Sequence, residues 1–246
     1  MYYCTYALGL LVFYIQLLHQ LSITCCNLIC GCMAVGCAFY GQYHYAVALI
    51  VLGAVFDFFD GMAARALGVS SPIGKELDSL ADVVTFGVAP SAILFHLFHE
   101  VHYPEALAPL EDYVPYVAFL MAAFSALRLA KFNIDERQHF GFIGLPTPAN
   151  ALFWSSLVLG EHAFLVSQKF NAVFLFLFML LFCFLLVCEV PMLALKFKNF
   201  GWADNKQRYV FLIGCLPLLL LGASSLAAII VWYVAVSIFF PRIVKG

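Results

Sequence analysis

The sequence predicts an all-α membrane protein, a polytopic bundle of about eight transmembrane helices. Of its 246 residues, 65% are hydrophobic and 11% are charged, whereas a soluble domain has roughly 45–50% apolar and about 25% charged residues. The apolar residues form long unbroken runs instead of weakly alternating segments of about ten residues, which excludes a transmembrane β-barrel. A membrane-spanning helix takes about 20 apolar residues, so the chain has room for about seven to nine spans.

Short polar or Gly/Pro-containing stretches divide the apolar runs into eight expected helices. Their expected ranges are 22–40, 45–67, 76–99, 113–133, 147–167, 170–196, 207–222 and 223–240. Only a Gly-Ala-Ser-Ser stretch at 222–225 separates the last two, so seven spans are the alternative. Residues 22–246 are expected to form one transmembrane domain. Residues 1–21 are a separate apolar segment, which can be an interfacial helix, an extra tilted span or an uncleaved signal-like segment.

The lysines and arginines indicate the orientation. With eight spans, eleven of the twelve fall on one side of the membrane, and Lys169 is the exception. Positive residues collect on the cytoplasmic side, so this side should face the cytoplasm. We expect an integral protein of the cytoplasmic (inner) membrane with its active site on that side. Seven spans would instead place Arg242 and Lys245 outside. No basic stripe suggests binding to nucleic acid.

Four aspartates lie inside the second and third expected helices. Asp57 and Asp60 are three residues apart, and Asp78 and Asp82 are four apart, so each pair projects from one helix face. An acidic residue at the bilayer centre costs about 2.5–3.5 kcal/mol, which makes a functional role the default interpretation. If the two helices form an antiparallel hairpin, all four carboxylates meet near its cytoplasmic end.

A site of carboxylate oxygens suits hard divalent cations, Mg²⁺ or Mn²⁺. Gly61 and Gly74 carry no side chain beside the cluster, which allows a ligand to approach closely. Arg65 and Ser71 offer donors to phosphate oxygens. Together these residues predict a site for a substrate that carries a pyrophosphate. The alternatives from another class are an acid-lined metal or ion transporter and a purely structural ion cluster.

The spacing of these residues is also a family signature. The pattern is Asp57-x2-Asp60-Gly61-x2-Ala64-Arg65-x8-Gly74-x3-Asp78-x3-Asp82, and it resembles the signature of the CDP-alcohol phosphotransferase family. Residues 24–31 are similar to the family's first-span segment. Residues 126–133 and 142–149 are similar to the bacterial and archaeal phosphatidylserine synthases within that family.

The resemblance implies an enzyme that transfers a phosphatidyl group from CDP-diacylglycerol to L-serine and releases CMP. It also implies that this enzyme is a homodimer embedded in membrane lipid. It implies that two divalent ions are held by Asp57, Asp60, Asp78 and Asp82, and that Asp82 is also the general base. The CDP-diacylglycerol site that it implies consists of Thr24, Asn27, Gly61, Ala64, Arg65, Ser71 and Gly74.

Arg128, Lys131 and Asn133 end the fourth expected helix on the cytoplasmic side, where they are candidates to bind serine. Glycerol 3-phosphate or inositol phosphate is the alternative acceptor, although each would favour a denser basic cluster. Glu189, inside the expected helix 170–196, has no assigned role; it is either buried and protonated or faces a cavity.

Overall fold

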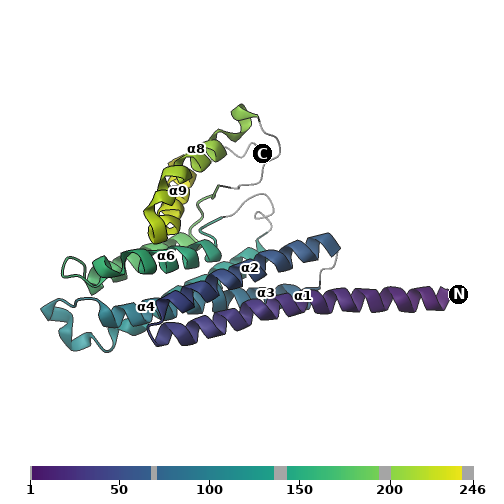
Figure 1. Ribbon diagram of the computed structural model, residues 1–246, viewed down its shortest axis with the longest axis horizontal. Helices are drawn as coiled ribbons and strands as arrows, with labels where there is room; N and C mark the ends of the chain where they lie inside the picture. The colour runs from purple at the N-terminus through teal and green to yellow at the C-terminus, as the bar shows by residue number, and fades with distance from the viewer. Residues whose placement is uncertain (1, 68–70, 136–142, 194–200, 240–246) are drawn as a thin grey trace.

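The computed structural model describes residues 2–67, 71–135, 143–193 and 201–239, without the side chains of 2–20, 64–67 and 203–204. In these ranges the regular elements are helices, as predicted, and no strand is formed. The α-helices are α1 (Tyr2–Phe39), α2 (Tyr43–Leu67), α3 (Pro72–Asp82), α4 (Ala89–Glu100), α5 (Leu120–Ile134), α6 (Thr147–Leu165), α7 (Ala172–Val187), α8 (Trp202–Leu218) and α9 (Ser225–Phe239). Figure 1 shows α1 to α4 running lengthwise together, with the α8–α9 pair at a steep angle to them.

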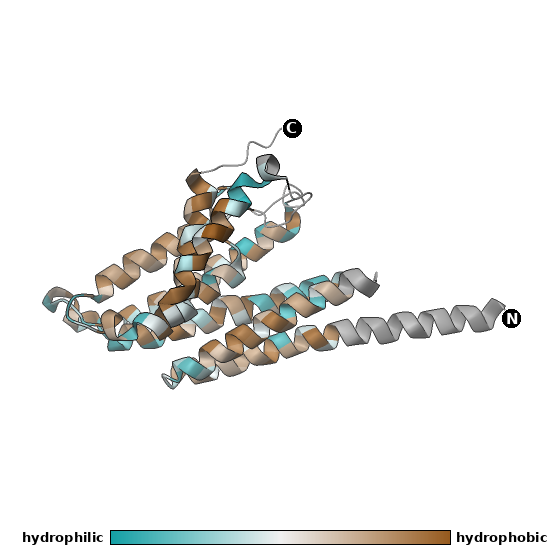
Figure 2. Ribbon diagram, turned by 45° about the horizontal axis from the view of Figure 1, so that its top comes forward, coloured by the Kyte–Doolittle hydropathy of each residue, from teal (hydrophilic) through white to brown (hydrophobic). Residues whose placement is uncertain are grey.

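Several helices are long and apolar enough to cross a membrane, which confirms a polytopic membrane protein. The five candidate spans among the described residues are Leu21–Phe39, Tyr43–Ala63, Pro72–Glu100, Val114–Ile134 and Asn205–Phe239. Hydrophobic residues cover most of the helical length, and hydrophilic residues gather toward the ends (Figure 2). Helix α7 is apolar but shorter, so the number of eight spans stays a prediction.

Helix α1 is longer than the expected 22–40. It begins at Tyr2 and continues for 38 residues, about 57 Å at 1.5 Å per residue. Residues 10–30 contain neither proline nor glycine, so nothing in the backbone interrupts the helix near residue 21. Its N-terminal half extends beyond the other helices in Figure 1.

The third expected helix begins earlier than predicted and contains a widened turn. It begins at Pro72 instead of residue 76, and Val83–Val88 forms a π-helical turn between α3 and α4. Pro90 has no N–H to donate to the carbonyl of Phe86, and its ring crowds that carbonyl, which accounts for the widening. The π-turn begins directly after Asp82 and so changes the direction in which the following side chains point.

The expected helix 170–196 was wrong at its C-terminal end. Helix α7 ends at Val187, and Cys188 has an extended backbone (ψ 154°). Pro191 disfavours a helical residue before it, and the segment pairs instead with residues 143–145: the N–H of Gly144 donates to the carbonyl of Val190 (2.9 Å). Glu189 therefore lies outside the helix.

The last apolar stretch forms two antiparallel helices, and the break expected at 222–225 is confirmed. Gly222 has a positive φ of 61°, a conformation that glycine adopts at little cost. The Trp232 indole N–H donates to the carbonyl of Phe211 (3.2 Å), which holds α9 beside α8.

Candidate active site

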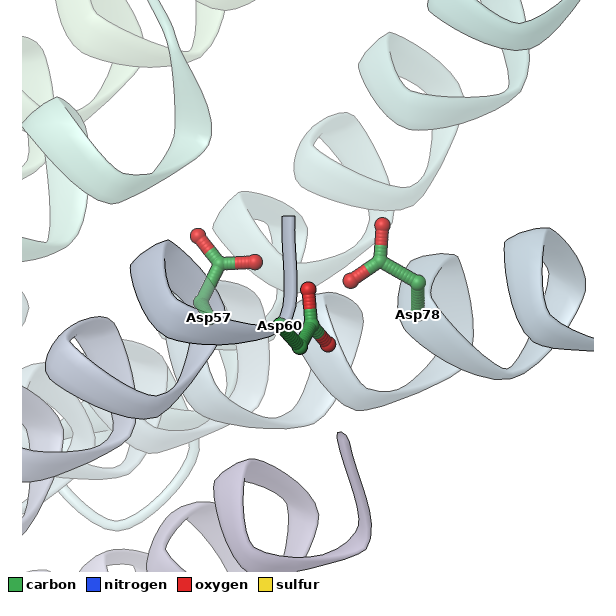
Figure 3. Close-up of side chains that lie close together, drawn as sticks. All are labelled: Asp57, Asp60 and Asp78. Carbon is green, nitrogen blue, oxygen red and sulfur yellow. The ribbon is translucent and has the colours of Figure 1, made fainter. Parts of the chain in front are cut away.

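Three of the four predicted aspartates converge. Asp57 and Asp60 lie on α2 and Asp78 lies on α3, and one carboxylate oxygen of each is within 4.8 Å of the others. Figure 3 shows the three carboxyl groups directed into the same space between the two helices. The spacing explains the convergence, because residues three apart on α2 lie on one face and α3 presents Asp78 toward that face.

Asp82 lies one turn further along α3 and is also buried, with 8% of its surface exposed. It is not part of the group within 4.8 Å. The side-chain amide of Asn27 donates to Asp82 Oδ1 at 3.2 Å. Asp82 thus borders the group of three and is oriented by a neutral donor.

Helix α1 contacts the carboxylates through two side chains one turn apart. The Thr24 hydroxyl donates to Asp60 Oδ2 at 2.6 Å, and Asn27 contacts Asp82 as described. Thr24 and Asn27 are both buried. The two residues expected near the nucleotide therefore also hold two of the aspartates in place, and charge-assisted hydrogen bonds of this kind are the stronger class.

Close helix packing fixes the position of Asn27, through residues that the sequence reasoning missed. The Thr85 hydroxyl, in the π-helical turn, donates to the carbonyl of Asn27 at 3.0 Å. A Cβ added at Gly31 would lie 2.4 Å from Thr85 Oγ1, and one added at Gly53 would lie 2.6 Å from Thr85 Cγ2. A glycine inside an apolar helical run is the signal that identifies such an approach.

The remaining predicted CDP-diacylglycerol residues flank the start of α3. Ser71 caps this helix, with its hydroxyl accepting from the N–H of Gly74 at 3.0 Å. Gly74 is buried, and Gly61 follows Asp60 on α2 and is partly exposed. Ala64 and Arg65 lie on α2, but their side chains are outside the described part of the chain.

The chemistry of the acidic group fits a divalent cation. Asp78 Oδ1 is buried and has no hydrogen-bond partner among the residues that the structure describes, and an unsatisfied buried carboxylate oxygen is costly. Two unit charges about 4 Å apart repel by roughly 4 kcal/mol at an effective dielectric constant of about 20. Oxygen ligands in this number suit Mg²⁺ or Mn²⁺.

A cavity of about 360 Å³ lies at the C-terminal end of α5, bordered by Ile143 and by residues 186–189. Arg128 lines it and is 6% exposed, and its Nε and Nη2 have no hydrogen-bond partner in the described ranges. The guanidinium carbon lies 5.1 Å from the centre of the Phe132 ring. Helix α5 also contacts α3 directly, because Asn133 donates to Ser79, which lies between Asp78 and Asp82 in the sequence, so the cavity and the aspartates lie on neighbouring helices.

The other two candidate serine residues differ in position. Lys131 lines the cavity and is exposed, and its ammonium group donates to the carbonyl of Val187 at 3.5 Å. Asn133 instead joins α5 to α3. Its side-chain amide donates to the Ser79 hydroxyl at 2.8 Å, and its backbone carbonyl accepts from the Lys75 ammonium group at 3.3 Å. Asp135 and Glu189 also line the cavity, which for Glu189 is one of the two environments expected from the sequence; neither was a predicted serine-binding residue.

These features define a class: helical membrane proteins in which a partly buried group of carboxylates lies near a cavity lined by charged residues of both signs. Comparison with known proteins identifies the group within that class. A model of the CDP-alcohol phosphatidyltransferase family matches residues 21–240, and the chain belongs to this family. The resemblance given by the aspartate pattern is thereby confirmed.

Several relatives carry the name CDP-diacylglycerol–serine O-phosphatidyltransferase. The chain is 44% identical to the one from Bacillus subtilis over 130 residues, which are 51% of this chain and 67% of that protein. It is 36% identical to the one from Methanocaldococcus jannaschii over 151 residues, 61% of this chain and 63% of that protein. It is 33% identical to the one from Mycobacterium leprae over 180 residues, 70% of this chain and 56% of that protein.

Proposed function

We propose that the protein transfers the phosphatidyl group of CDP-diacylglycerol to L-serine and so produces phosphatidylserine and CMP. The observation that carries the proposal is the convergence of one carboxylate oxygen each from Asp57, Asp60 and Asp78 within 4.8 Å, near Asp82 and a cavity lined by charged residues. Membership of the family and the names of the relatives supply the reaction class and the acceptor.

The aspartates are the proposed ligands of two divalent ions, Mg²⁺ or Mn²⁺. Asp57, Asp60, Asp78 and Asp82 would hold them, and bound ions would supply positive charge to neutralise the diphosphate and to make the phosphorus more electrophilic. The proposed CDP-diacylglycerol contacts are Thr24, Asn27, Gly61, Ala64, Arg65, Ser71 and Gly74. Ser71 keeps a hydroxyl proton to donate while it caps α3.

Asp82 is the proposed general base. Its carboxylate accepts the proton of the serine hydroxyl as the hydroxyl oxygen forms a bond to the phosphorus that carries diacylglycerol. The bond from that phosphorus to the bridging oxygen of the diphosphate breaks, and the electron pair leaves with CMP. Asn27 donates to Asp82 Oδ1, which leaves Oδ2 for the serine proton. A single displacement of this kind inverts the configuration at phosphorus.

Both substrates are proposed to enter from the cytoplasmic side of the cytoplasmic membrane, with the lipid tails between helices in the bilayer. Lys75, at the start of α3, contacts the last turn of α5, so Lys75, Arg128 and Lys131 lie toward the same end of the bundle. Positive residues favour the cytoplasmic side. We also propose a homodimer, following the family resemblance.

The test measures CMP release by the purified protein in lipid vesicles containing CDP-diacylglycerol, with Mg²⁺ or Mn²⁺. L-Serine, glycerol 3-phosphate and inositol phosphate are supplied separately. We expect release with serine above the level with either phosphorylated acceptor. Release only with a phosphorylated acceptor would reassign the substrate, and no release with any acceptor from folded protein would contradict the enzymatic function.

A further inference from the structure

The cavity beside Asp82 carries charges of both signs. Arg128 and Lys131 lie three residues apart on α5, and the acidic side chains of Asp135 and Glu189 line the same space. Arg128 is buried and its Nε and Nη2 lack hydrogen-bond partners in the described ranges, so a ligand anion would satisfy donors that are costly to leave unpaired. The two acids offer acceptors to a cationic group on the same ligand.

The backbone holds Glu189 at this place. The N–H of Leu145 donates to the carbonyl of Leu185 at 2.8 Å, and the N–H of Gly144 donates to the carbonyl of Val190 at 2.9 Å. These two bonds fix the chain on both sides of Glu189. Lys131 adds a third connection through the carbonyl of Val187. Because three hydrogen bonds hold the backbone of this segment, little backbone entropy is lost there when a ligand binds. A side chain on such a segment is suited to selecting a ligand.

The charge pattern discriminates between acceptors. A phosphorylated alcohol brings two negative charges, which the two acids would repel even as Arg128 and Lys131 attract them. An amino acid brings one carboxylate and one ammonium group, which match the cations and the acids respectively. Rejecting a competitor through like charges is an established way to gain specificity.

We propose that Glu189, assisted by Asp135, binds the ammonium group of the amino-acid acceptor while Arg128 binds its carboxylate, so that Glu189 determines the choice of acceptor. This inference rests on the proposed transfer to serine and adds the residues that select serine over phosphorylated alcohols. The hydrogen bond from Asn133 on α5 to Ser79 on α3 holds the helix that carries Arg128 against the helix that carries Asp82, the proposed base.

The test compares two acceptors that differ only in the ammonium group, L-serine and 3-hydroxypropanoate, in the CMP-release assay. Glu189→Gln is expected to lower kcat/KM for serine about tenfold, mainly through KM, since the loss of one charged hydrogen bond is worth about 1.5 kcal/mol or more. For 3-hydroxypropanoate, kcat/KM should change less than about twofold, and KM for CDP-diacylglycerol should stay the same.

Two further variants make the outcome decisive. Glu189→Asp keeps the negative charge and should recover most of the preference for serine over 3-hydroxypropanoate. This variant keeps the test informative if Glu189→Gln folds poorly. Glu105→Gln makes the same chemical change on the exposed 3-10 helix Glu105–Leu110 and is the matched control. Its kcat/KM for each acceptor should equal that of the unmodified protein. An equal loss with both acceptors, or an unchanged ratio between them, would overturn the role of Glu189 and leave the proposed transfer standing. Failure of the unmodified protein to use serine would overturn both.

Discussion

The side-chain amide of Asn27 on α1 donates a hydrogen bond to Asp82 Oδ1 on α3 at 3.2 Å, across 55 residues of sequence. Asn27 is fully buried, and the oxygen of its side-chain amide, Oδ1, has no hydrogen-bond partner in the described part of the chain. The amide thus orients the carboxylate that we propose as the general base. The same residue is a candidate contact of the nucleotide, and the two roles have different kinetic consequences.

Asn27→Ala is expected to lower kcat about tenfold or more, because Asp82 loses the donor that orients it. A role confined to nucleotide binding would instead raise KM for CDP-diacylglycerol and leave kcat unchanged. Steady-state CMP release separates the two results. Cys32→Ala, on the exposed side of α1, is the control and should leave both constants unchanged.

Asp82→Asn is expected to reduce CMP release by a factor of about 10² to 10⁴, the range that general-base catalysis contributes. The substitution preserves the shape of the side chain, so the thermal unfolding temperature in detergent should change little. Glu76→Gln, an exposed acid on the same helix, should retain full activity. Substantial turnover by Asp82→Asn would assign the base to another group.

Removal of divalent ions by EDTA is expected to abolish turnover, and addition of Mn²⁺ should restore it. Asp78→Asn should raise the Mn²⁺ concentration for half-maximal activity about tenfold or more, because one of the three carboxylates within 4.8 Å loses its charge. Direct Mn²⁺ binding, measured by electron paramagnetic resonance without substrate, should weaken in parallel. Unchanged Mn²⁺ binding by Asp78→Asn would contradict its assignment as a ligand.

Gly31→Ala is expected to destabilise the protein by about 1–3 kcal/mol, the usual cost of overpacking. The new Cβ would lie 2.4 Å from Thr85 Oγ1 and 2.9 Å from Thr85 Cα, so the backbone of the π-helical turn itself must move. Activity should fall as well, because Thr85 holds Asn27.

Gly36→Ala is the matched control on the same helix, since a Cβ there meets nothing within 4 Å. It should leave the unfolding temperature in detergent unchanged or slightly raised, because alanine favours the helix more than glycine does. Equal behaviour of the two alanine variants would contradict the close contact between α1 and the π-helical turn.

Much of the fold followed from local sequence features. Long apolar runs identified a helical membrane protein, and the positive φ at Gly222 confirmed the break expected in the last run. Helix ends were less predictable where the cause was not local. The end of α7 at Val187 depends on Pro191 nearby but also on pairing with Gly144, which is more than 40 residues away.

The sequence by itself determined the family and the four aspartates. Helical periodicity places residues three or four apart on one face, and acids inside a membrane are costly enough to indicate a functional role. Only the tertiary structure decided which partners these acids have. The hydrogen bonds from Thr24 and Asn27 and the contact of Glu189 with the Arg128 cavity join segments far apart in the chain. Such contacts depend on how helices pack, and no local periodicity encodes the packing.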